Sequence, residues 1–167
     1  MNATTQKETL DLGAMMEETL DGIPDAPDFV NCPPPGEYRL SVQDAKVDQY
    51  ETKDEPGIQK QRLKFNYKIE QTVSVSGNEP PLPDNSMFSE TFQATVDGLG
   101  YAKKRIKEIM NVSDLAGVTL GQMMETVKGQ SFDARITVRK TAGKGANAGT
   151  TYENPTIRVI PPKAATA

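Results

Sequence analysis

The chain has 167 residues, a formal net charge of -4, 36% hydrophobic residues, one cysteine and no histidine. The absence of histidine excludes a Ser/His/Asp triad, a Cys/His dyad and a zinc site built on histidine, and the single Cys32 excludes an internal disulfide and a cysteine-cluster metal site. No apolar run approaches the length of about 18 residues that a membrane span needs. We therefore expect a non-enzymatic protein of the reducing cytoplasm, with no cofactor and no membrane partner.

The charge divides the chain into an acidic arm and a mildly basic body. Residues 1–36 contain seven acids and one base, which leaves 16 acids and 18 bases in the rest of the chain. The run Asn-Cys-Pro-Pro-Pro-Gly over residues 31–36 cannot form a helix or a central strand, because proline fixes φ and lacks the amide donor. We predict a mobile arm over residues 1–32, a folded body over 33–162 and a short tail over 163–167.

Alternation of apolar and polar residues predicts five strands in the body. The first strand begins at Glu37, and the other four cover residues 62–69, 87–95, 132–139 and 151–160. Loops are expected at 49–59, 78–85 and 141–150, where Gly, Pro and polar residues gather. Between the third and fourth strands, Asp97 is expected to cap a helix whose apolar residues follow spacings of 3, 4 and 3. A second short helix is expected over residues 119–128.

The order of three strands, a helical segment and two strands excludes an alternating βαβ architecture. It predicts a mainly β protein with a helical insertion, organised as an OB-fold-like five-stranded antiparallel barrel. We expect the core to contain the aromatic residues Tyr38, Phe65, Tyr67 and Phe132. An OB-fold binds its ligands on the face of strands 2 and 3 and between the loops that join strands 1 to 2 and 4 to 5.

The residues expected at those places suit a single-stranded nucleic acid, which is bound by cations along its backbone and by aromatic rings that stack on its bases. Residues 141–150 contain Gly-Lys-Gly but lack the G-x-x-x-x-G-K-[ST] pattern of a phosphate loop, so we reject nucleotide hydrolysis. The candidate DNA-binding residues come from the second strand and from the two loops: Tyr50, Arg62, Lys64, Lys68, Arg139, Lys140, Lys144 and Tyr152.

Several stretches of the body resemble bacteriophage single-stranded DNA-binding proteins of the OB-fold type. They are Pro-Pro-Gly-Glu-Tyr at 34–38, Leu-Lys-Phe-Asn-Tyr-Lys-Ile at 63–69, Met-Phe at 87–88, the lysine-rich segment 102–109 and Tyr-Glu-Asn-Pro-Thr-Ile-Arg-Val-Ile at 152–160. The resemblance covers residues 33–162. It implies sequence-independent binding of single-stranded DNA during phage DNA replication or recombination, in the cytoplasm of an infected host cell.

The acidic arm suggests a second role and leaves an alternative open. Proteins of this family commonly end in an acidic tail that recruits partners, whereas here the acids gather at the N-terminal end. We hypothesise that residues 8–28 lie in the basic groove when DNA is absent, or bind replication or recombination proteins. The alternative is a phage structural or adaptor protein that binds other proteins through the barrel loops and the arm, and that forms homo-oligomers insensitive to salt.

Overall fold

The computed structural model describes residues 11–17, 19, 21 and 29–162. Within these residues the protein is mainly β, with five strands, three α-helices and one short 3-10 helix. In chain order the elements are α1 (Leu12–Met15), β1 (Gly36–Thr52), β2 (Glu55–Val75), β3 (Met87–Gln93), α2 (Val96–Met110), α3 (Leu120–Val127), β4 (Ser131–Ala142), η1 (Gly145–Asn147) and β5 (Thr151–Ile160). The tail and most of the predicted arm lie outside the described residues.

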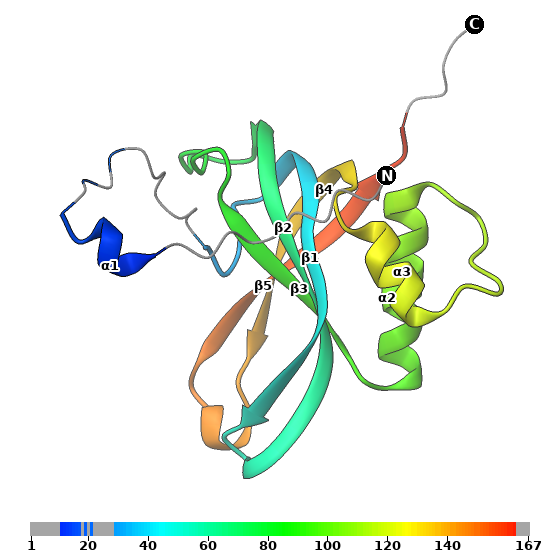
Figure 1. Ribbon diagram of the computed structural model, residues 1–167. Helices are drawn as coiled ribbons and strands as arrows, with labels where there is room; N and C mark the ends of the chain where they lie inside the picture. Colours follow the sequence, from blue (N-terminus) through cyan, green and yellow to red (C-terminus); the bar gives the residue numbers. More distant parts are fainter. Residues whose placement is uncertain (1–10, 18, 20, 22–28, 163–167) are drawn as a thin grey trace, which may run out of the picture.

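The five strands form one antiparallel sheet in the order β3-β2-β1-β4-β5 (Figure 1). Strand β1 pairs with β2 along almost its whole length, but with β4 only from Gly36 to Ser41. Beyond that point the sheet divides into two hairpins, β1–β2 and β4–β5, which extend in the same direction from the body. Strands β3 and β5 are the two edges of the sheet and form no backbone hydrogen-bond ladder with each other, so the sheet is open.

Alternate residues in the central parts of β1 to β4, together with Ile157 of β5, face the core, which α2 and α3 cover on one side (Figure 1). The core residues of the strands are Tyr38, Leu40, Val42, Ala45, Leu63, Phe65, Tyr67, Ile69, Phe88, Phe92, Phe132, Ala134, Ile136 and Ile157. Helix α2 adds Ala102, Ile106 and Ile109 at the predicted spacing, and α3 adds Met123 and Val127. The four aromatic residues that the sequence assigns to the core are buried, which confirms that prediction.

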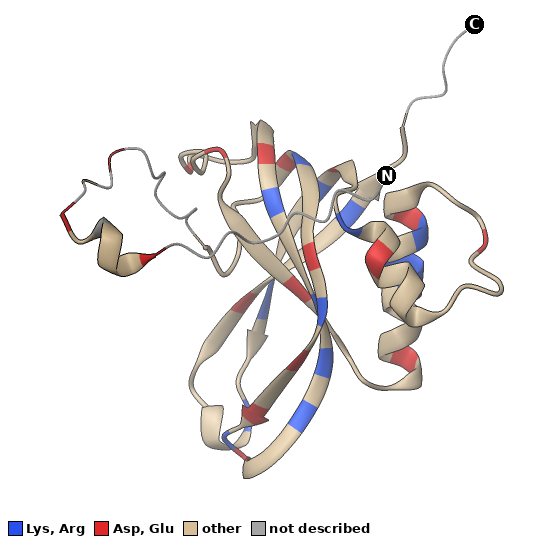
Figure 2. Ribbon diagram, viewed as in Figure 1, with Lys and Arg blue, Asp and Glu red and all other residues tan. Residues whose placement is uncertain are grey.

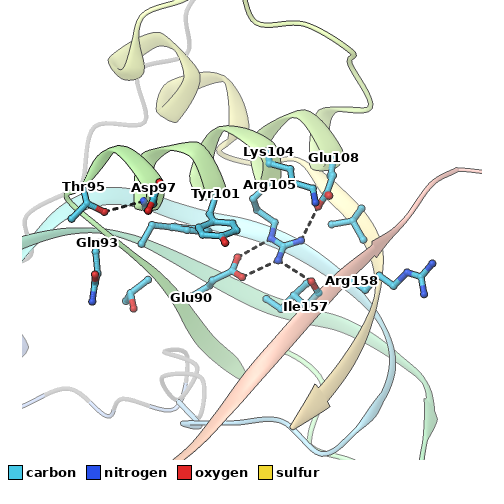
Figure 3. A pocket seen from close by; sticks show the side chains of 14 residues that line it. Glu90, Gln93, Thr95, Asp97, Tyr101, Lys104, Arg105, Glu108, Ile157 and Arg158 are labelled. Atoms are coloured by element: carbon cyan, nitrogen blue, oxygen red, sulfur yellow. Dashed lines mark hydrogen bonds and ion pairs between the residues drawn. The ribbon is translucent and has the colours of Figure 1, made fainter. Parts of the chain in front are cut away.

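A largely buried arginine connects the two edges of the sheet (Figure 3). Arg105 of α2 donates from Nε and Nη2 to the two carboxylate oxygens of Glu90 on β3, both at 3.0 Å, and from Nη2 to the Ile157 carbonyl oxygen on β5 at 2.8 Å. Tyr67 donates its hydroxyl to Glu90 at 2.7 Å. Burial alone would lower the pKa of Arg105, but the Glu90 carboxylate raises it above its ordinary value. Side-chain hydrogen bonds thus link β3, α2 and β5.

Two sequence predictions about element ends are wrong. Residues 49–59 were expected to be a loop, but β1 and β2 continue through them to a tight turn at Lys53 and Asp54. The apolar alternation is lost there because neither face of this hairpin is buried in the core beyond Ala45. Helix α2 is capped by Thr95, whose hydroxyl accepts from the Gly98 amide at 3.0 Å, and Asp97 lies in the first turn instead.

The described helices set one limit on membrane insertion. Among them, none is long and apolar enough to cross a bilayer. This agrees with the sequence, in which acids and bases interrupt every apolar stretch.

Candidate nucleic-acid interface

The outward side of β2 gathers three of the predicted cations. Arg62, Lys64 and Lys68 alternate with the buried residues Leu63, Phe65 and Tyr67, so they project from one face of the strand. On the neighbouring strand β1, Lys46 pairs with Lys64 and Tyr50 pairs with Lys60, which places both residues on the same side of the sheet. We call the set Lys46, Tyr50, Arg62, Lys64 and Lys68 the basic face, and Figure 2 shows basic residues following one another along β2.

Arg62 holds Tyr50 in place on the basic face. The Arg62 guanidinium carbon lies 4.5 Å from the centre of the Tyr50 ring, within cation–π range. Its Nε also donates to Asp48 at 2.8 Å, and this hydrogen bond lowers the pKa of the Asp48 carboxyl. Because the guanidinium contacts both partners, it fixes a half-buried ring at the surface, where a base can stack on it.

The lysines of the basic face differ in how far their charge is neutralised. Lys46 lies 3.8 Å from Asp44. Among the described residues, neither Lys64 nor Lys68 has an ion-pair partner. Both ammonium groups can therefore bind phosphate without first breaking a contact with a described carboxylate.

Phe29 is an aromatic residue on this side of the sheet that the sequence analysis did not select. It forms a parallel bridge with Met87 of β3, next to a hydrogen bond of 2.8 Å from the Val30 amide to the Met87 carbonyl. Its ring is 54% exposed and lies 5.9 Å from the Lys64 ammonium. The sequence placed Phe29 in the arm, and no periodicity there indicated a strand contact. Of the segment 8–28 that was expected to lie in the basic groove, residues 8–10, 18, 20 and 22–28 lie outside the described residues.

The other four predicted residues lie on the β4–β5 hairpin and do not share one face. Arg139 and Lys140 are adjacent in β4, so they point to opposite sides of the ribbon. Lys140 lies 3.7 Å from Glu153, whereas Tyr152 shares the side of Arg139 and is 41% exposed. Lys144 is exposed just before η1. The structure therefore brings together Tyr50, Arg62, Lys64 and Lys68, and places the remaining four elsewhere.

The ends of the two hairpins contact each other. The carboxylate of Asp54, in the β1–β2 turn, accepts a hydrogen bond of 3.0 Å from the Ala146 amide of η1. A β-carbon at Gly145 would lie 2.7 Å from the same carboxylate. The two loops that an OB-fold would use to flank its ligand are thus in contact in this structure.

A cavity of about 900 Å³ lies between β3, α2 and β5 (Figure 3). Its polar wall contains Glu90, Arg105 and Lys104, and Tyr101 projects from α2 with 68% of its surface exposed. Glu90 and Arg105 are already paired with each other. The other lining residues include Thr95, Asp97 and Arg158.

Comparisons with known proteins do not identify a family for this chain. No model of a known protein family matches it, and a search of curated proteins finds no match.

Proposed function

We propose that this protein binds single-stranded DNA without sequence preference. The observation that carries the proposal is the basic face, where Arg62, Lys64 and Lys68 follow one strand and Tyr50 lies beside them under a guanidinium. Cations at alternate strand positions recur at about 6.6 Å, which suits the repeated phosphates of an extended strand. Stacking on a tyrosine face accepts every base, so no base edge has to be read.

The arrangement of the elements supports an OB-fold as the framework for this activity. In the OB-fold, as here, three strands precede the helix and two follow it. Arg105 stands where hydrogen bonds between the third and fifth strands would close a barrel, since it contacts both β3 and β5. On this interpretation the basic face corresponds to the ligand side of strands 2 and 3.

The resemblance to phage single-stranded DNA-binding proteins gives the proposal its biological setting. It suggests that the protein covers single strands exposed during phage DNA replication or recombination in the infected cell. Such a role needs binding that is indifferent to sequence and easily reversed, and a site dominated by phosphate contacts provides both.

A fluorescence anisotropy titration with a thymidine oligonucleotide tests the proposal. We expect the logarithm of the binding constant to fall against the logarithm of salt by about 0.7 for each phosphate contacted. Tyr50→Ala should weaken binding by about 1 to 3 kcal/mol, the range for one stacked base. Tyr101→Ala is the matched control, because it removes an exposed tyrosine on α2 and should leave affinity unchanged. Equal effects of the two variants, or equal affinity for duplex DNA, would contradict the proposal.

The cavity beside α2 favours a second candidate function, that of an adaptor for other proteins. Tyr101 lines this cavity and is strongly exposed on α2, and an exposed aromatic residue is typical of a protein contact. An adaptor would self-associate or bind its partner independently of salt and would not retain DNA. Light scattering at 50 mM and 500 mM salt, run beside the anisotropy titration, separates the two functions.

A further inference from the structure

The side of the β4–β5 hairpin that faces solvent is strongly cationic from Arg135 onward, and its one described carboxylate, Asp133, lies at the root of the hairpin, where it forms an ion pair with Arg39 of β1. The register pairs Arg135 with Arg158, Thr137 with Thr156, Arg139 with Asn154 and Thr141 with Tyr152. Because paired residues of an antiparallel ribbon share a face, these side chains lie together, and each is exposed. We call this set the ribbon face: Arg135, Thr137, Arg139, Thr141, Tyr152, Asn154, Thr156 and Arg158.

Two arginines occupy directly opposed positions on the ribbon face. Like charges at paired positions of a sheet destabilise it, and Arg135 and Arg158 occupy such a pair. Glu37 of β1 pairs with Arg135 from the other side, but among the described residues neither Arg139 nor Arg158 has an ion-pair partner. An anion bound between Arg135 and Arg158 would remove the repulsion between their positive charges.

The uncharged residues of the ribbon face also suit a nucleic-acid backbone. Threonine hydroxyls and the Asn154 amide can donate hydrogen bonds to phosphate oxygens, and guanidinium groups bind phosphate through two parallel bonds. Along β4, Arg135 and Arg139 are four residues apart, about 13 Å. Tyr152 adds a partly exposed ring at the end of the row.

A belt of ion pairs separates the ribbon face from the basic face. Arg39 of β1, on the middle of the sheet, lies 3.3 Å from Asp133 and 3.8 Å from Glu70. Together with Glu37, these acids would repel a phosphate chain that crossed from β2 to β4. The two cationic faces therefore form separate sites.

We propose that the ribbon face is a second binding site for the sugar-phosphate backbone of single-stranded DNA. One molecule then holds two strands, one on each face, and brings them together as strand annealing requires. This inference rests on the proposed function for its first strand. Each face alone is small, so binding at the ribbon face depends mainly on its three arginines.

Counting the oligonucleotides bound to each chain tests the proposal. The probe is a thymidine hexanucleotide, too short to follow both faces, and the method is isothermal titration calorimetry with native mass spectrometry at 20 mM salt. The full-length chain is compared with an Arg135→Gln, Arg139→Gln, Arg158→Gln variant and with a Lys64→Gln, Lys68→Gln variant. All five positions lie at the surface of the sheet, and circular dichroism checks the fold of each protein.

We expect two hexanucleotides on the wild-type chain and one on each variant. Three phosphate contacts at the ribbon face predict a slope of about -2 against the logarithm of salt, or roughly a 20-fold loss of affinity from 50 to 200 mM. The second site is refuted if the wild type binds one hexanucleotide and only the lysine variant loses it. It is also refuted if the wild type binds one hexanucleotide and both variants bind it more weakly. One hexanucleotide lost only in the arginine variant would instead refute the proposed function of the basic face.

Discussion

Replacing Arg105 by methionine should destabilise the fold far more than a surface substitution. The side chains of Arg105 and Glu90 are each 14% exposed, and Arg105 also donates to Glu108 and to the Ile157 carbonyl oxygen, both at 2.8 Å. Removing one partner of a buried ion pair leaves the other charge uncompensated and costs about 3 to 5 kcal/mol. For a protein of this size, that loss lowers the melting temperature by about 6 to 20 °C.

A double-mutant cycle in urea measures this effect. Glu90→Gln keeps an oxygen that can accept from the Tyr67 hydroxyl while removing the charge, so Arg105→Met combined with Glu90→Gln should cost well under the sum of the two single variants. Lys104→Met, at the adjacent exposed position of α2, is the control and should change the free energy of unfolding by less than about 0.5 kcal/mol. If Arg105→Met costs below about 1 kcal/mol, or if the two losses simply add, the ion pair between Arg105 and Glu90 does not hold the two sheet edges together.

Two further predictions concern glycine packing and alkaline pH. Gly98→Ala should lower the free energy of unfolding, measured in urea, by about 1 to 3 kcal/mol, because the new β-carbon would lie 2.0 Å from the Gln93 carbonyl oxygen. A β-carbon at Gly100 would meet nothing within 4 Å, so Gly100→Ala should be neutral or stabilising. Equal effects of the two variants would refute this reasoning. Burial raises the pKa of Tyr38 from 10.0 to about 12, so the stability it contributes is complete below pH 10 and is lost as pH rises through about 12. Urea midpoints of wild type that stay constant between pH 10 and 12 would contradict this.

The sequence predicts most of the body where one face of each strand is buried. The alternation over residues 62–69 assigns Phe65 and Tyr67 to the core correctly, and the last strand has the predicted limits. The prediction fails for the β1–β2 hairpin end, where Val47 and Ile58 are exposed and the polar residues no longer alternate with buried ones. The alternation of apolar and polar residues identifies a strand only over the part of it that contacts the core.

The candidate site is predicted less completely than the fold. Alternation within β2 brings Arg62, Lys64 and Lys68 to one face, as a single strand must. The same rule puts Arg139 and Lys140 on opposite faces, a signal that was present in the sequence, yet both were assigned to one site. Glu90 lies on the same side of β3 as Phe88 and Phe92, where Arg105 compensates its charge, and that partner comes from a helix that no strand periodicity can locate.

The hydrogen bond between Asp54 and the Ala146 amide has a mechanical consequence. A single long hairpin bends easily where it leaves the body of the sheet. Two hairpins joined at their ends restrain each other and bend less. A force on one hairpin is passed to the other through the Asp54 carboxylate. A displacement of one hairpin is therefore passed to the other, and replacing the Asp54 carboxylate would let the two hairpins move independently.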